Sequence, residues 1–389
     1  MKKVFTILTV VLLVFALSSA VAAGDKKSED KFEFGGRMMM DWVFFGSADD
    51  AIDTNFGPFY DGIEFRRARL YVKGGWGNIE FKVNYDFGGG DADFKDVYMK
   101  IKKLPFNLTI GHFKEPFNLE ELTSSKYITF MERSLPNMFA PGRNSGIKID
   151  GNLAKKRIYY GVGIFRDADG YGEALDVDPT YNFTLRMAAT PVYSDKGKTL
   201  IHVGVAFTAR DYGDGGSVRF RQRPEVHITD RFVNTGHFDA NGSSIFGIEA
   251  AAVLGSLSVQ GEYMSASVDA PDSGDPTFDG YYIMASWWLT GEYRKYKDSS
   301  AAFDRVTPEK NFMDDGGFGG FELALRYSSL NLSDASIDGG KLSDFTIGAN
   351  WHLNKYTRIM GNYVMADHDT YGTFGAFMLR FQYDFKMKK

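Results

Sequence analysis

Arg219, Arg221 and Arg223 occupy alternate positions near the middle of the chain. In an extended segment this spacing places the three guanidinium groups in a single row on one face. Fixed positive charges along a passage attract anions, and walls of low dielectric constant strengthen that attraction. The row is therefore a candidate anion-binding surface. The alternative is a charged loop in contact with solvent or lipopolysaccharide, which needs no passage.

A second basic stretch, residues 65–73, comes earlier in the chain. If it is extended, Arg67, Arg69 and Lys73 share one face. Acidic residues gather in a different stretch, residues 111–146, where their simplest role is to pair with wall arginines and hold that stretch in place. The four candidate anchors are Glu115, Glu120, Glu121 and Glu132. Among these anchors, Glu120 is the one whose removal we expect to loosen the stretch.

Residues 111–146 also stand out because the alternating pattern on both sides of them stops there. Long connections without regular structure are uncommon and are usually functional or disordered. Disorder fits poorly, because the stretch keeps many large apolar residues that would be costly to leave in water. An apolar side and a charged side together predict a loop packed against the inner wall of a hollow structure.

Other chemistry is not indicated by the sequence. The acidic residues Asp167, Asp169, Asp176 and Asp178 lack the spacing of a calcium loop, and the six histidines lack metal-ligand spacing. There is no Gly-x-Ser-x-Gly motif for a hydrolase and no cysteine that could serve as a thiolate. We therefore predict no catalysis, no bound metal and no cofactor.

Most of the remaining chain alternates strictly between apolar and polar residues. Residues 78–87 show this period of two, and it recurs in residues 181–190, 344–353 and 377–385. Segments of about ten residues match the length of a tilted strand that crosses a bilayer. Tyr and Trp near many segment ends suit the membrane interface, and the polar face of each strand would then line a lumen.

Short turns join some of these segments, and long polar connections join others. The long connections lie at about residues 46–61, 112–144, 166–180, 211–243, 268–278 and 298–316. This layout predicts an all-β fold, a transmembrane antiparallel β-barrel with turns at one end and long loops at the other. The pattern admits sixteen or seventeen strands, and closure with both chain ends on one side favours sixteen. A soluble sandwich or propeller would show domain or blade repeats, which we do not find.

The N-terminus has the pattern of a secretory signal peptide. Two lysines precede an apolar run and a group of small residues that ends at Ala23. A membrane anchor is the alternative, but the run is shorter than the ~20 apolar residues that a spanning helix needs. We predict a signal peptide in residues 1–23 and a barrel domain in residues 24–389. The formal net charge of −5 argues against nucleic acid as a partner.

Several short strings follow one another in a specific order along the chain. They are Phe65-Arg66-Arg67-Ala68-Arg69, Gly111-His112-Phe113-Lys114-Glu115-Pro116-Phe117, Thr123-Ser124-Ser125-Lys126, Glu132-Arg133, Arg223-Pro224-Glu225, Arg231-Phe232-Val233 and Arg326-Tyr327. In these strings the chain resembles the phosphate-selective porin O and P family over nearly all of its mature length. The resemblance implies a trimer of sixteen-stranded barrels whose long third loop folds into the lumen. It also implies an arginine ladder that leads to lysines at a constriction.

The resemblance assigns roles to individual residues. Arg66 and Arg67 would belong to the ladder, Lys126 to the constriction loop and Lys297 to a second constriction position. Apart from the resemblance, we name Arg294, three positions before Lys297, as a further pore candidate. A third constriction lysine of the family would fall near Thr307, where this chain has none. The candidates to replace it are Arg305 and Lys310.

The sequence thus predicts a passive channel in the outer membrane of a Gram-negative-type bacterium. It would prefer small anions, with phosphate or polyphosphate as the expected cargo, and its partners would be membrane lipid, lipopolysaccharide and two further copies of the chain. Two alternatives stay open: a general porin of weak selectivity, motivated by Thr307, and a non-conducting structural or adhesive barrel, motivated by acidic loops.

Overall fold

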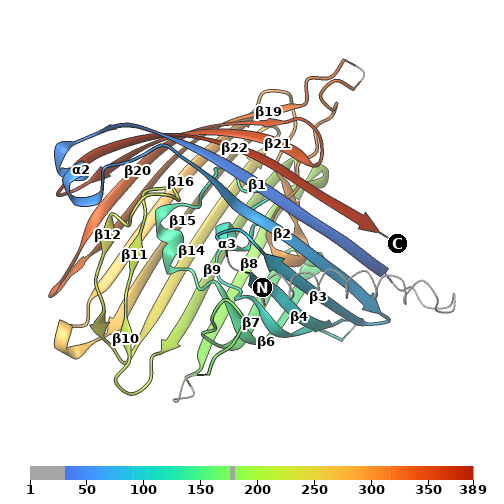
Figure 1. Ribbon diagram of the computed structural model, residues 1–389. Coiled ribbons are helices and arrows are strands. Elements are labelled where there is room, and N and C mark those ends of the chain that lie inside the picture. Colours follow the sequence, from blue (N-terminus) through green and yellow to red (C-terminus); the bar gives the residue numbers. More distant parts are fainter. Residues whose placement is uncertain (1–30, 91, 103, 176–179, 315, 389) are drawn as a thin grey trace, which may run out of the picture.

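The computed structural model describes residues 31–388 apart from 91, 103, 176–179 and 315. Within these residues, sixteen strands pair in antiparallel order and close into one barrel (Figure 1). The predicted fold class and strand number are therefore confirmed. The predicted signal peptide, residues 1–23, lies outside the described residues, as do Asp176 and Asp178.

The barrel strands are eight to eighteen residues long. In order they are β1 (Lys31–Ala48), β2 (Gly62–Trp76), β3 (Ile79–Asp86), β4 (Asp93–Ile101), β5 (Asn107–Lys114), β6 (Arg143–Leu153), β7 (Ile158–Arg166), β8 (Asn182–Ser194), β9 (Thr199–Asp211), β14 (Gly242–Leu254), β15 (Leu257–Asp269), β16 (Thr277–Trp288), β19 (Gly320–Asp334), β20 (Ile337–His352), β21 (Thr357–His368) and β22 (Gly372–Lys388). Strand β22 pairs with β1, and this pairing closes the sheet.

Side chains on these strands alternate between the outer surface and the lumen. In β9, Ile201, Val203 and Val205 are 40 to 47% exposed, whereas His202 is fully buried. A row of exposed apolar side chains is stable when lipid surrounds it, and polar residues then face inward. The period of two in the sequence therefore reports membrane-facing strands. No helix within the described ranges is long and apolar enough to cross a membrane.

Strand β2 departs from this alternation at its arginines. Its register against β1 shifts by one residue, because Met39 pairs with Arg67 and Met40 pairs with Phe65. Arg66 is the extra residue of a β-bulge, which re-aims a side chain that would otherwise face lipid. As a result, the neighbouring residues Arg66 and Arg67 both line cavities inside the barrel.

The two barrel ends differ in their connections. Strand β1 begins and β22 ends at one end, which we call the turn end, and the helix α2 (Asp50–Phe56) of the first loop lies at the opposite loop end (Figure 1). Three further short helices are η2 (Ala154–Lys156) and η3 (Asp195–Gly197) in turns, and η4 (Pro271–Ser273) in a loop.

One long connection is at the turn end. Residues 289–319, the turn-end segment, join β16 to β19 and contain β17 (Lys295–Lys297), η5 (Asp298–Ser300) and β18 (Ala302–Asp304). The prediction that all long connections share one end is therefore wrong for this segment. Its length does not fix its position, whereas the number of preceding crossings does: β16 is the twelfth barrel strand and runs toward the turn end.

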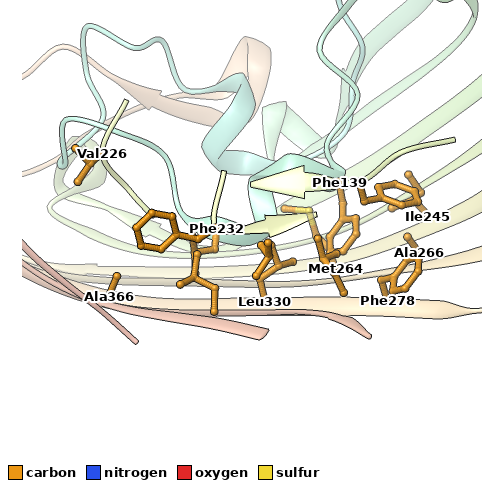
Figure 2. Packing of buried hydrophobic residues seen from close by; sticks show 14 of the residues in the cluster. Phe139, Val226, Phe232, Ile245, Met264, Ala266, Phe278, Leu330 and Ala366 are labelled. Carbon is orange, nitrogen blue, oxygen red and sulfur yellow. The ribbon is translucent and has the colours of Figure 1, made fainter. Parts of the chain in front are cut away.

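The third loop, residues 115–142, folds into the lumen as predicted. It carries α3 (Leu119–Leu122) and η1 (Leu135–Phe139). Phe117, Leu119 and Leu135 are fully buried. Figure 2 shows Phe139 among Ile245, Met264 and Phe278 of the wall strands β14, β15 and β16. The apolar face of the loop thus packs against one side of the wall, which leaves the opposite side open.

The fifth loop, residues 212–241, also enters the barrel. Its short strands are β10 (Ser217–Val218), β11 (Arg221–Gln222), β12 (Val233–Asn234) and β13 (Phe238–Asp239). Val226 and Phe232 of this loop belong to the same buried apolar cluster as the third loop (Figure 2). Both loops therefore pack against the same apolar region of the wall.

Candidate functional site

Carboxylates of the third loop bond to cations of the barrel wall. Glu115 is fully buried and accepts hydrogen bonds from Nη1 of Arg210 in β9, at 2.9 and 3.0 Å. Glu132 accepts two bonds of 2.7 Å from Arg66, and a third of 3.0 Å from Arg380 in β22. These bonds connect the start and the middle of the loop to opposite parts of the wall.

Glu120 has a wall partner that it shares with the fifth loop. Its Oε1 lies 3.3 Å from Nη1 of Arg326 in β19, and its Oε2 accepts a bond of 2.6 Å from the Ser134 hydroxyl. Arg326 also bonds the fully desolvated carboxylate of Glu225 in the fifth loop, with Nε at 3.0 Å. A single wall arginine thus contacts both inward loops.

Glu121 differs from the other three carboxylates because one of its partners belongs to its own loop. It pairs with Lys114 at 2.8 Å, at the end of β5, and with Arg133 at 3.1 Å. Burial acts to raise the pKa of Glu121, but Arg133 and Lys114 outweigh burial and hold the pKa well below its ordinary value. All four predicted anchors are therefore paired with cations, while their anchoring role stays a prediction.

The side of the barrel that the loop leaves open contains a cavity of about 290 Å³, which we call the basic cavity. It lies along β1 to β6 and reaches Ser124 and Ser125 of the third loop. Nine cationic side chains and one carboxylate, that of Asp96, line it. The cations are Arg37, Arg67, Arg69, Lys82, Lys100, Lys114, Arg133, Arg143 and Lys148.

Carboxylates neutralise only part of this charge. Asp86, Asp96, Asp150 and Glu121 form the ion pairs of the cavity cations, so nine positive charges minus four negative ones leave an excess of five. Nearby charges of one sign raise the local concentration of counter-ions in a confined passage. The cavity is therefore built to attract anions.

Two arginines in the basic cavity are poorly neutralised. Arg37 bonds the Ser125 hydroxyl at 2.6 Å, and within the described chain it forms no ion pair. Arg67 lies 3.9 Å from Asp86, and its Nε has no hydrogen-bond partner among the described residues. Arg37 also stands directly opposite Arg69 across the β1–β2 pair, where like charges repel, and of the two only Arg69 is paired, with Asp86 at 2.6 Å.

The predicted arginine row of the fifth loop lines another cavity, of about 550 Å³, which we call the outer cavity. Arg219, Arg221 and Arg223 all belong to its lining, together with Arg66 from the bulge of β2. Arg133 lines both the outer and the basic cavity, so the two adjoin. Basic residues thus continue from the loop end to the middle of the barrel.

The predicted constriction residue Lys126 is in a third and much smaller place, which we call the inner cavity, of about 20 Å³. Its Nζ lies 3.1 Å from Asp384 of β22, which also pairs with Arg305 of the turn-end segment. Burial lowers the pKa of Lys126 to about 8, Arg37 adds to this effect, and Asp384 opposes it. Lys126 is therefore beside the basic cavity without lining it.

The remaining predicted cations are divided by the structure. Arg294 and Arg305 line the inner cavity, and the Arg294 guanidinium lies 3.6 Å from the ring centroid of Phe303. Lys297 and Lys310 are exposed, and neither belongs to the linings of the three cavities. Of the two candidates to replace the lysine missing at Thr307, only Arg305 thus lies beside Lys126.

Sequence reasoning missed most of the basic cavity. Arg37, Lys100, Arg143 and Lys148 were not predicted as site residues, although each lies on a predicted or neighbouring strand. Lys82 lies on the polar face of residues 78–87, and that alternation alone places it in the lumen. The other signal available was the number of cations at lumen-facing positions of the first six strands.

Asp167 and Asp169 have structural partners. Asp167 pairs with Arg210 and accepts a bond of 2.9 Å from Asn144, while Asp169 accepts backbone N–H bonds from Tyr171 and Glu173. Throughout the described residues, no three His, Asp or Glu side chains form a metal-binding group.

Comparison with known proteins places the chain in a family. A family model described as "Phosphate-selective porin O and P" matches residues 32–385. Porin O of Pseudomonas aeruginosa is 28% identical over 393 residues, covering 90% of this chain and 85% of the relative. An uncharacterized protein of Caulobacter vibrioides is 27% identical over 366 residues, covering 90% of this chain and 71% of the relative.

Solved structures show the same fold. The anion-selective porin from Comamonas acidovorans superposes with a TM-score of 0.61 at 14% identity, covering 92% of this chain and 100% of that chain. The trimer form of OmpT, an outer membrane protein of Vibrio cholerae, gives 0.58 at 12% identity, with 92% and 99% covered. Since the family match spans the whole barrel and the fold is that of outer-membrane porins, this chain belongs to the phosphate-selective porin O and P family and is a porin of the Gram-negative outer membrane.

Proposed function

We propose that this porin is a passive diffusion channel that prefers anions. The observation that carries the proposal is the basic cavity, where five positive charges remain after every carboxylate partner is counted. A cation that enters this cavity meets net repulsion, whereas an anion exchanges part of its hydration shell for N–H donors. The names of the family and of the Comamonas acidovorans porin support the same preference.

Single-channel recording in a planar bilayer tests this preference. With a potassium chloride gradient across the membrane, an anion-preferring channel gives a reversal potential of the sign set by chloride. A reversal potential of the opposite sign would sink the proposal. A barrel that shows no conductance after reconstitution would instead support the structural or adhesive alternative.

We further propose phosphate or polyphosphate as the physiological cargo. The arginine row of the outer cavity and the cations of the basic cavity adjoin, so a multivalent anion can exchange partners without crossing an uncharged gap. Guanidinium groups also match the geometry of phosphate oxygens better than they match a spherical ion. Reversal potentials in phosphate and in chloride, measured on the same channels, distinguish a preference for phosphate from a preference for anions in general.

The competing proposal is a porin of weak selectivity. Its motivation is the constriction, where Thr307 replaces a lysine of the family pattern and Asp384 neutralises Lys126. If this reading is right, chloride passes as readily as phosphate, and phosphate does not block chloride current.

Assembly and export complete the proposal. We propose a homotrimer in contact with outer-membrane lipid and lipopolysaccharide, because a relative of the same fold has a trimer form. Residues 1–23 are proposed to be removed as a signal peptide. Cross-linking of the protein in intact membranes tests the trimer, and N-terminal sequencing of the mature protein tests the cleavage.

A further inference from the structure

The inner cavity contains polar nitrogen atoms that the protein itself does not satisfy. Its lining includes Trp288, Arg294, His352 and Arg358. Within the part of the chain that the structure describes, Nε1 of Trp288, Nη1 of Arg294, Nε2 of His352 and Nε of Arg358 are buried without hydrogen-bond partners. The Trp288 and arginine nitrogens are donors, and buried donors without partners are rare and costly, so three of them around one cavity indicate a missing acceptor.

The strand register brings these residues together. Trp288 stands opposite Glu322 on the β16–β19 pair, and His352 stands opposite Arg358 on the β20–β21 pair. The rings of Trp288 and His352 lie 4.8 Å apart between centroids. Gly320 lies between their strands, where an added Cβ would come within 3.2 Å of the Trp288 ring. The absence of a side chain at Gly320 therefore leaves room for the Trp288 ring.

Charge distinguishes an anion from a water molecule as the missing acceptor. Asp384 is engaged by Lys126 and Arg305. Among the described residues, neither Arg294 nor Arg358 forms an ion pair, although they are only 5% and 3% exposed. Burial lowers the pKa of Arg294 to about 10, which leaves its guanidinium charged at neutral pH. Five cations and three carboxylates line the cavity, the carboxylates being Asp304, Glu322 and Asp384, so an excess of two positive charges remains and favours an anion near Arg294 and Arg358.

The size of the cavity restricts the anion. Its volume of about 20 Å³ is enough for one particle of roughly the size of water or chloride. We propose that the inner cavity is a binding site for one small monovalent anion of the size of chloride. This site is separate from the permeation path of the proposed function, since no residue lines both the inner and the basic cavity.

An anion at this place would connect three parts of the chain. The wall contributes Arg358, whose Nη1 also donates a bond of 2.9 Å to the backbone oxygen of Ile128 in the third loop. The turn-end segment contributes Arg294, and the third loop contributes Lys126 and Thr129. Bound anion should therefore hold the turn-end segment against the wall, because a ligand of the closed state suppresses opening by mass action.

Limited proteolysis tests the site in solution. The purified channel is digested with chymotrypsin in sodium chloride or in sodium gluconate of equal ionic strength, since gluconate is too large for the cavity. We expect chloride at about ten times its Kd to slow cleavage within residues 289–319 by roughly tenfold. Equal cleavage rates in the two salts would overturn the proposal, as would equal protection by inorganic phosphate.

Variants separate the site from general effects of salt. Arg294→Met should abolish the protection by chloride, whereas Lys297→Met removes one positive charge from the same segment and should retain it. If Arg294→Met does not fold, Trp288→Phe keeps an aromatic side chain and removes the indole N–H donor, and it should weaken chloride protection several-fold. Unchanged protection in the folded variants would show that chloride acts elsewhere.

Crystals grown in sodium bromide locate the anion directly. An anomalous peak within hydrogen-bond distance of Arg294 and Arg358 is expected. A peak without protection in solution means an adventitious ion only and overturns the proposal, as does a peak confined to the basic cavity. Because reversal potentials report the permeation path, loss of this site with unchanged anion preference would refute the inference and leave the proposed function intact.

Discussion

Lumen-facing arginines on two sides of the barrel are in opposite situations. On the β1 to β6 side, Arg37 and Arg67 face an open cavity and are poorly neutralised by carboxylates. On the β19 to β22 side, Arg326 and Arg380 are 1% exposed and bond to carboxylates and backbone oxygens of the loops, and Arg380 also bonds Asp41 of β1. The residue type and the strand position are the same, and the presence or absence of the packed loop decides the role.

This difference follows from the apolar face of the third loop. The loop can pack only where the wall offers apolar residues, and Ile245, Met264 and Leu330 offer them on one side alone. Arginines beneath the loop lose water and need carboxylate partners, whereas arginines opposite the loop keep water and can exchange it for anions. The loop thus separates cations that pair with its carboxylates from cations that stay open to the lumen.

The largest expected effect comes from removing the arginine that both loops share. Arg326→Met leaves the buried carboxylates of Glu120 and Glu225 without a cation, which should cost about 3–5 kcal/mol of unfolding free energy. Chemical denaturation in detergent, followed by tryptophan fluorescence, measures this loss. Adding Glu225→Gln to the variant should restore part of the stability. An unchanged midpoint would show that covered arginines are not structural.

The second prediction concerns the open side. Arg37→Gln combined with Arg67→Gln removes two of the five excess charges and leaves the ion pairs of the four anchor carboxylates in place. At about 8 Å in water each charge changes the energy of a passing anion by about 0.5 kcal/mol and that of a cation by as much in the opposite direction, so losing two charges should lower the anion-to-cation permeability ratio roughly thirtyfold. Reversal potentials measure this ratio. Lys73→Gln, on the same strand but outside the cavity lining, is the control and should leave it unchanged.

The third prediction ranks the anchors of the loop. Burial raises the pKa of Glu120 against the effect of Arg326, so this site disfavours the charge. At Glu132, Arg66 outweighs burial and the pKa lies well below its ordinary value, so that site stabilises the charge. Glu132→Gln should therefore loosen the loop more than Glu120→Gln, with higher conductance and more current noise in single-channel records. The reverse order would contradict the ranking.

Sequence alone was sufficient for the barrel and for the inward third loop. Strands that face lipid on one side and the lumen on the other alternate between apolar and polar residues. A loop rich in Phe and Leu that lacks this alternation must pack against an apolar surface. The position of residues 289–319 was missed because the length of a connection does not reveal its end of the barrel. Strict alternation turns Arg66 away from the lumen when Arg67 and Arg69 face it. The structure differs because a single bulge reverses the alternation at this point.

The site was less predictable for the same physical reason. Arg219, Arg221 and Arg223 are neighbours in sequence, and their row could be found by spacing. The basic cavity gathers residues from six strands and a loop, and the partner that neutralises each cation comes from far along the chain. Asp384, for example, lies on the last strand, 258 positions after the Lys126 with which it pairs.

The smallest expected effect separates Lys126 from the passage. Because this lysine lies in the inner cavity and pairs with Asp384, Lys126→Ala should lower anion preference by less than about twofold, in contrast to the loss at Arg37 and Arg67. The lowered pKa of Lys126, about 8, also predicts a pH dependence. The amine is mostly charged at pH 7 and mostly neutral at pH 9, so the small contribution of Lys126 to chloride preference should disappear as the pH rises across this interval. Reversal potentials at both pH values measure the change, which Lys126→Ala should not show.

The block of chloride current by phosphate sharpens the comparison. Block that is equal in Lys126→Ala and the parent would place the lysine off the permeation path. Strong loss of block would instead return Lys126 to the constriction and move the boundary between the two sides of the barrel.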